Sequence, residues 1–264
     1  MMGMFSELYR YRSFIISSIK NDLINRFSRS KLGGLWAILN PLSQVAIYAL
    51  ILSNVLSAKL PGIDNKYAYS IYLMAGLLAW NLFNEVILRS LNMFIDNGDL
   101  MKKMQFPKAT IPSIVGGVNF VNNILLFLAM LIIFFLLGHG FSLNILWLIP
   151  FSLLLLIFSL GIGLILGVLN VFIRDIGQVI PILLQVLFWF TPIAYPISII
   201  PEQYRYLLKF NPISYFTGAY QEILAYNRVP NISELLLLLT IAIIIIGFGV
   251  FLFRRASAEM VDVL

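Results

Sequence analysis

The sequence predicts an all-α integral membrane protein with six transmembrane helices, and three observations lead to that prediction. The chain of 264 residues is 60% hydrophobic and 11% charged, with a mean hydropathy of +0.92. A soluble domain of this size cannot hide that much apolar surface, so part of its solvent must be lipid. The apolar residues also form runs of about 20, the length of a helix that crosses a hydrocarbon core roughly 30 Å thick. Third, the basic residues cluster in alternate connections between these runs.

Six apolar runs meet this length, and we place them at residues 35–56, 69–88, 113–137, 145–169, 176–195 and 235–253. Only the stretch NVFIRDI separates the fourth run from the fifth. Its Arg174 and Asp175 would each cost several kcal/mol in the middle of a bilayer, but little at its surface. The sequence therefore predicts a tight hairpin with this charged pair at the membrane surface.

The distribution of Lys and Arg predicts the side that each connection faces. Thirteen of the 18 basic residues lie in the N-terminal segment, in residues 89–112, in the hairpin and at the C-terminus. The other connections, residues 57–68, 138–144 and 196–233, hold the remaining five. The positive-inside rule therefore places both termini and the hairpin in the cytoplasm. Because membrane topology accounts for the excess of Lys and Arg, we expect no nucleic-acid partner.

Residues 1–34 form the first predicted unit, and residues 35–264 form the transmembrane domain. The first unit lacks the apolar core and the cleavage site of a signal peptide. At helical spacing its apolar residues share one face, which predicts an amphipathic helix along the cytoplasmic membrane surface: Phe5, Leu8, Tyr9, Ile15, Ile16, Ile19, Leu23 and Phe27. The helix is either a plain anchor or a cradle for a cytoplasmic partner.

Residues with catalytic chemistry are scarce. The chain has no cysteine and no phosphate-binding loop motif, so we expect it to hold neither ATP nor a thiolate metal site. Its one histidine, His139, lies between two glycines in an outer turn, where we expect a solvated side chain. Glu85 and Arg89 have the spacing of a structural ion pair at the membrane edge. We therefore predict no catalytic residue, metal or cofactor on this chain.

Uncharged polar and aromatic residues follow single faces of several spans. Amides cannot face lipid cheaply, so these faces contact either other helices or a water-filled path. Asn119 and Asn123 form one such face on the third span. The pairing of amides with rings favours a path for sugars, because rings pack on sugar C–H surfaces while amides bond hydroxyl groups. The candidate path-lining residues are Asn40, Gln44, Tyr48, Gln185, Phe188, Trp189 and Tyr195.

Small residues mark the fourth span. Ser159, Gly163 and Gly167 recur at every fourth position, which predicts close backbone packing between spans or between subunits.

The outer connection at residues 196–233 is too long for a simple loop. Pro201 precedes one short amphipathic helix, and the pair Asn211-Pro212 breaks the chain before a second. We predict a re-entrant helical hairpin that dips into the membrane and caps the path. Its candidate gate residues are Pro196, Tyr204, Phe210, Asn211, Pro212, Tyr215 and Phe216.

Three stretches resemble one known family. They are RFSRSKLGGLWAILNPL at residues 26–42, NVFIRDIGQVIPILLQVLFWFTPIAYP at 170–196 and FNPISY at 210–215. With the N-terminal helix and six spans, they resemble the membrane subunits of ATP-binding-cassette exporters for bacterial cell-surface polysaccharides, the O-antigen and teichoic-acid permeases. The resemblance covers essentially the whole chain.

This resemblance implies a homodimer that forms a channel across the bacterial inner membrane. Two separate ATPase subunits would bind ATP and Mg²⁺ on its cytoplasmic side, and a polysaccharide linked through diphosphate to undecaprenol would move outward. Residues 89–112 would supply the coupling element that contacts the ATPase, unless they are an ordinary basic loop. The candidate coupling residues are Lys102, Lys103, Met104, Gln105, Phe106, Arg174 and Asp175.

Three other functions stay open at this point. A permease for a small lipophilic compound would need a narrower and less aromatic path. A polytopic membrane enzyme is disfavoured because none of the spans contains a histidine. A scaffold without transport activity would leave the polar faces unexplained.

Overall fold

The computed structural model describes residues 2–27, 36, 39, 43, 67–103, 107–208 and 210–263. Every regular element in those ranges is a helix, which confirms the all-α prediction for this part of the chain. The elements are α1 Met2–Arg10, α2 Arg12–Phe27, α4 Ala68–Asp96, α5 Gly98–Lys103, α6 Thr110–Leu136, η2 Leu143–Trp147, α7 Leu148–Phe172, α8 Ile176–Trp189, η3 Ile197–Ile199, α9 Glu202–Leu208, α10 Pro212–Leu224, α11 Ile232–Ala256 and α12 Glu259–Val263.

Four helices are long and apolar enough to cross a membrane. They are α4, α6, the joined helix Leu143–Phe172 and α11. They coincide with the predicted second, third, fourth and sixth spans. The predicted first span lies almost entirely outside the described residues, including Asn40, Gln44 and Tyr48, so the six-span count stays a prediction.

The predicted fifth span is shorter than expected. Helix α8 has 14 residues and ends at Trp189, so it is about 21 Å long at 1.5 Å per residue. The expectation that it runs to Tyr195 was wrong. Pro192 has no backbone N–H and its ring clashes with the preceding turn, and it also disfavours the helical conformation at Thr191. The chain therefore leaves the helix and turns before η3.

Helix α4 forms the centre of the bundle, and small residues bring its neighbours close. A Cβ on Gly163 would lie 2.6 Å from the Cβ of Ser90, and one on Gly249 would lie 2.8 Å from the carbonyl oxygen of Gly161. The first contact joins α7 to α4 and the second joins α11 to α7. Both contacts confirm that the fourth span packs closely against other spans within one chain.

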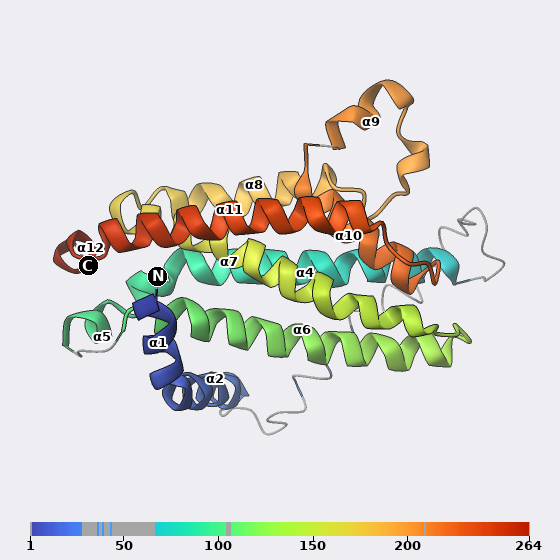
Figure 1. Ribbon diagram of the computed structural model, residues 1–264. Coiled ribbons are helices and arrows are strands. Elements are labelled where there is room, and N and C mark those ends of the chain that lie inside the picture. Colours follow the sequence, from blue (N-terminus) through green and yellow to red (C-terminus); the bar gives the residue numbers. More distant parts are fainter. Residues whose placement is uncertain are drawn as a thin grey trace.

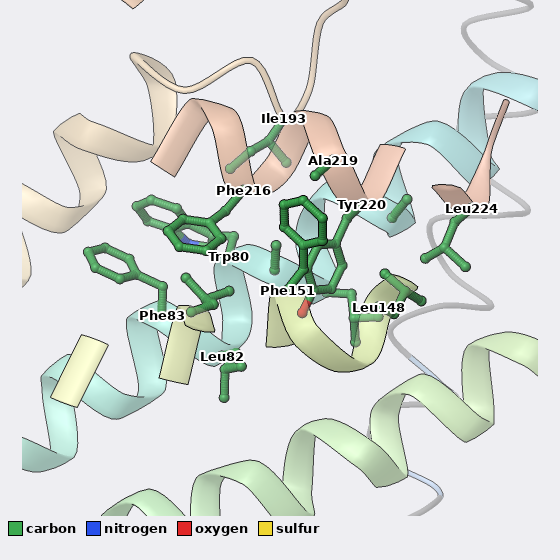
Figure 2. Packing of buried hydrophobic residues seen from close by; sticks show 14 of the residues in the cluster. Trp80, Leu82, Phe83, Leu148, Phe151, Ile193, Phe216, Ala219, Tyr220 and Leu224 are labelled. Atoms are coloured by element: carbon green, nitrogen blue, oxygen red, sulfur yellow. The ribbon is translucent and has the colours of Figure 1, made fainter. Parts of the chain in front are cut away.

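Helix α10 is part of the hydrophobic core. Its Phe216 and Tyr220 are fully buried, and Figure 2 shows them among the rings of Trp80, Phe83 and Phe151. Because these rings come from α4 and α7, α10 is packed against the two most central helices. The Tyr220 hydroxyl lies 2.6 Å from the Ser152 hydroxyl of α7, which satisfies its polar end.

The connections separate into two ends of the bundle (Figure 1). Both termini lie at one end together with α5 and α12, while α9, α10 and the turn at 138–144 lie at the other. This grouping agrees with the predicted alternation of sides.

The predicted N-terminal helix is divided in two. Helices α1 and α2 meet at Tyr11, and α2 packs against α6, where Ile19 approaches Gly117. An ion pair of 3.0 Å joins Asp22 of α2 to Arg89 of α4. The N-terminal helices are therefore fixed to the bundle by a half-buried apolar contact and a charge pair.

His139 is not the solvated side chain that we expected. It is 9% exposed, and its Nε2 lies 2.7 Å from the carbonyl oxygen of Leu224 at the end of α10. Phe134 and Phe141 pack edge-on against its ring. The imidazole thus connects the α6–α7 turn to α10, and its role is structural.

Candidate functional site

A cleft lined by rings and amides lies between α4 and α8. It has a volume of about 360 Å³. Helix α4 contributes Trp80 and Asn84, and α8 contributes Leu184, Gln185, Phe188 and Trp189. Two indoles, a phenyl ring and two side-chain amides therefore share one opening.

The aromatic rings of this cleft are fixed against one another. The Phe188 ring packs edge-on against Trp80, with 5.4 Å between ring centroids, and against Trp189 at 5.5 Å. Trp80 is buried, whereas Trp189 is 67% exposed. The Tyr195 hydroxyl donates a hydrogen bond of 2.7 Å to the carbonyl oxygen of Trp189. The cleft thus has a rigid aromatic floor and an open aromatic edge.

This chemistry suits weak contacts with a sugar chain. A ring face offers apolar area to sugar C–H groups, and an amide such as Gln185 both donates and accepts hydrogen bonds. None of the described residues that line the cleft has an ionisable side chain. A charged or deep pocket would hold one sugar firmly, whereas this surface tolerates successive sugars.

Four predicted path residues lie together here: Gln185, Phe188, Trp189 and Tyr195. Sequence reasoning missed Trp80 and Asn84. Their i, i+4 spacing on one face of α4 was the available signal, because it repeats the pairing of a ring with an amide.

The amides of α6 belong to the packing between helices. Asn123 donates a hydrogen bond of 3.0 Å from Nδ2 to the carbonyl oxygen of Leu78 on α4. Asn119 bonds the carbonyl oxygen of Val115 within its own helix. Of the two interpretations left open for this face, contact with another helix is the one observed for Asn123.

The segment predicted to form an outer hairpin contains α9 and α10, and its candidate gate residues fall into three groups by exposure. Tyr204 and Phe210 are exposed, at 53% and 81%, whereas Phe216 is fully buried against Phe158. Pro196, Asn211, Pro212 and Tyr215 are half-buried.

Asn211 connects the hairpin to the end of α8. Its Oδ1 caps α10 by accepting from the Ile213 N–H, and its Nδ2 donates to the Thr191 hydroxyl at 3.0 Å. The break predicted at Asn211-Pro212 is therefore the N-terminus of α10, with proline in its first turn. This junction places the hairpin beside the aromatic cleft.

The predicted coupling residues lie at the opposite end of the bundle. Lys102 and Lys103 end α5, and Arg174 and Asp175 are exposed between α7 and α8. Figure 1 shows these two segments at the same end but on different sides of it. Met104, Gln105 and Phe106 lie outside the described residues.

Helix α5 is held by the C-terminus. Met101 and Met260 are both buried in one cluster, which joins α5 to α12. Lys108 donates from Nζ to the carbonyl oxygen of Ser257 at 2.6 Å. At this end of the bundle, the C-terminal segment with α12 therefore holds the short basic helix α5 in place.

Comparison with known proteins identifies one family over most of the chain. The model of a family described as ABC-2 type transporter matches residues 14–225. An O-antigen export system permease protein RfbA from Myxococcus xanthus is 27% identical over 264 residues, 99% of each chain. Another RfbA, from Klebsiella pneumoniae, is 30% identical over 247 residues, 92% of each chain. The polysialic acid transport protein KpsM from Escherichia coli is 26% identical over 242 residues, 90% of this chain and 92% of that protein.

Proposed function

Since the chain belongs to the ABC-2 type transporter family, we propose that it is the permease subunit of an ATP-driven exporter of bacterial cell-surface polysaccharide. The cargo is a glycan carried on undecaprenyl diphosphate, of the O-antigen or teichoic-acid kind. The relatives named O-antigen export permeases and polysialic acid transport protein support a polysaccharide as the substrate class.

The aromatic cleft between α4 and α8 is the observation that carries this proposal. Trp189 exposes two thirds of its side chain in a segment rich in apolar residues, and Gln185 is exposed one turn away. An amide beside an open ring is poorly suited to lipid but well suited to sugar. A path for a small lipophilic compound needs neither the amide nor the row of rings.

Two copies of the chain enclose the path in this proposal. Leu184 is the only buried residue of helix α8, and seven of its 14 residues are exposed, so much of its surface has no partner within the described part of one chain. A second copy that faces this surface closes the cleft into a channel. The first predicted span, with Asn40, Gln44 and Tyr48, completes the lining.

ATP hydrolysis on two separate subunits drives transport. Helix α5, with Lys102 and Lys103, docks on these subunits, and the hairpin at Arg174 and Asp175 lies near them. Both termini share this end of the bundle, which we assign to the cytoplasm by its basic excess. ATP and Mg²⁺ bind the partner subunits and not this chain.

The outer gate is formed by the segment from η3 to α9. Helix α10 is anchored by Phe216 and Tyr220 in the core, so its movement would open that core. By contrast, α9 buries no side chain and stands away from the bundle in Figure 1. Tyr204 and Phe210 therefore move to close the path when no polymer occupies it, while α10 stays fixed.

The proposal is tested by replacing both Trp189 and Tyr195 with Ala. We expect surface polysaccharide to fall several-fold while the complex with the ATPase subunits still assembles, because neither side chain lies in the core. Phe251→Ala is the matched control, since this ring is 60% exposed on α11, away from the cleft. Normal export by the double variant would show that these rings do not line the path.

A further inference from the structure

A second cavity opens where α9, α10 and the start of α11 meet. Its volume is about 830 Å³, within the range of about 300 to 1,000 Å³ that small-ligand sites occupy. The helices that line it lie at the end of the bundle opposite the termini, and the lining includes Arg205, Glu222, Arg228 and Glu234. The path-lining and coupling residues do not use it.

Two polar groups of this cavity lack partners. The Ser214 hydroxyl oxygen has almost no accessible surface, its residue is 7% exposed, and it makes no hydrogen bond with the described residues. The half-buried Glu234 carboxylate has no hydrogen bond or ion pair with the described residues. Buried polar groups in native proteins are nearly always hydrogen-bonded, so the unpaired hydroxyl of a residue that lines a cavity indicates a ligand, which the hydroxyl meets by rotation about the Cα–Cβ bond.

Aromatic rings form another part of the wall. Tyr72 and Tyr226 pack edge-on with 6.3 Å between ring centroids. Arg228 lies over the Tyr226 ring at 5.4 Å and 4.0 Å from the Glu222 carboxylate. Arg228 is therefore already engaged by a carboxylate and a ring, and Arg205, which also lines the cavity, is paired with Glu202. Among the described lining residues, Glu234 is the charge without a partner.

The cavity adjoins the aromatic cleft through a short piece of chain. Pro196 lines the cavity, and its neighbour Tyr195 bonds the carbonyl oxygen of Trp189 in the cleft. Gln221 lines the cavity as well and donates to the carbonyl oxygen of Pro192 at 3.1 Å. A glycan chain that leaves the cleft therefore meets this cavity next.

We propose that the cavity is a glycan-binding subsite that holds one or two sugars of the emerging polymer beside the outer gate. Sugar hydroxyl groups bond the Ser214 hydroxyl and the Glu234 carboxylate, and a sugar face packs on Tyr226. Glu222 and Glu234 line the cavity together with Arg205 and Arg228, so its formal charges balance, and the unpaired Glu234 carboxylate favours sugars that can donate a hydroxyl or amino hydrogen to it. This inference rests on the proposed function and names a site where that substrate pauses.

The test measures binding of a short oligosaccharide to the purified complex of permease and ATPase subunits in nanodiscs. The probe is the repeat-unit oligosaccharide released by mild acid from the surface polysaccharide of the same cells, titrated by calorimetry. We expect Glu234→Gln to weaken binding about tenfold, because a charged hydrogen-bond acceptor is lost. Ser214→Ala should weaken it several-fold without lowering the melting temperature, since it removes a hydroxyl that has no partner.

The matched control is Tyr206→Ala, which changes an exposed side chain of α9 that does not line the cavity. Unchanged binding in both cavity variants, from a permease that still exports its polysaccharide, would overturn the subsite and leave the proposed function intact. A wild-type complex that exports no polysaccharide would instead overturn the proposed function. Retention of a phospholipid that the oligosaccharide cannot displace would identify a lipid site and contradict the subsite.

Discussion

Lys108 donates a hydrogen bond of 2.6 Å from Nζ to the carbonyl oxygen of Ser257, 149 residues further along the chain. It joins the start of α6 to the link between α11 and α12. Because Met260 of α12 is buried with Met101 of α5, the C-terminal helix supports the helix that we propose as the ATPase contact.

This support predicts an effect on coupling. Lys108→Met keeps the aliphatic stem but removes the donor, and a hydrogen bond from a charged group contributes about 1.5 to 3 kcal/mol. We expect ATP hydrolysis by the assembled complex to respond about tenfold less to glycan substrate, with assembly retained. Lys20→Met, an exposed lysine on α2, is the control. Equal responses in the two variants would mean that α12 does not position α5.

The contact between Gly161 and Gly249 predicts a large stability effect. Gly249→Leu forces α11 away from α7, because its Cβ alone would lie 2.8 Å from a backbone oxygen. Overpacking of this kind costs about 1 to 3 kcal/mol, so the melting temperature in detergent should fall by several degrees. Gly247→Leu adds the same side chain where no atom lies within 4 Å of the Cβ position. That variant should melt like the wild type, and equal losses would contradict the packing.

Two neighbouring asparagines on α6 provide a second stability test. Asn123 bonds the carbonyl oxygen of Leu78, whereas the buried Nδ2 of Asn122 has no hydrogen-bond partner among the described residues. Asn123→Leu should cost about 1 kcal/mol, the usual contribution of a hydrogen bond between membrane helices. Asn122→Leu should be neutral or stabilising, because it removes a buried polar group without a partner. The reverse order of melting temperatures would contradict this assignment.

Much of the fold follows from the sequence, because a long apolar run with charges only at its ends is most stable in a bilayer as a membrane-spanning helix. The runs that became α4, α6, α7 and α11 were predicted for this reason. The fifth span was predicted to be too long because the prediction followed the high hydropathy of residues 176–195. It gave too little weight to Pro192, and a proline at this position ends the helix. Periodicity also predicted the N-terminal helix but not its division at Tyr11.

The candidate site was harder to predict because its residues come from distant parts of the chain. Gln185, Phe188 and Trp189 share one face of α8, so helical spacing was enough to group them. Trp80 completes the cleft from another helix, and no local pattern shows that contact. His139 was expected in solvent for the same reason, since its partner Leu224 is 85 residues away.

Membrane topology can be tested by labelling single introduced cysteines, and the protein itself gives no background labelling because the chain contains no cysteine. Tyr204→Cys on α9 should react with an impermeant thiol reagent added to intact cells, because we place α9 outside. Asp262→Cys on α12 should react only after the membrane is permeabilised. Both side chains are exposed, so access depends on the side of the membrane and not on burial. Labelling of Asp262→Cys from outside would invert the proposed orientation.

The most direct test of the central claim is transport by the purified permease and ATPase subunits in liposomes. The lipid-linked polysaccharide is added to the membrane, and complexes whose ATPase subunits face the outer solution are energised with ATP. We predict that ATP moves the glycan into the lumen, where an added glycosidase no longer digests it, and that Trp189→Ala slows this protection. Full digestion despite ATP hydrolysis, together with pumping of a small lipophilic dye, would contradict the claim and favour a permease for small compounds.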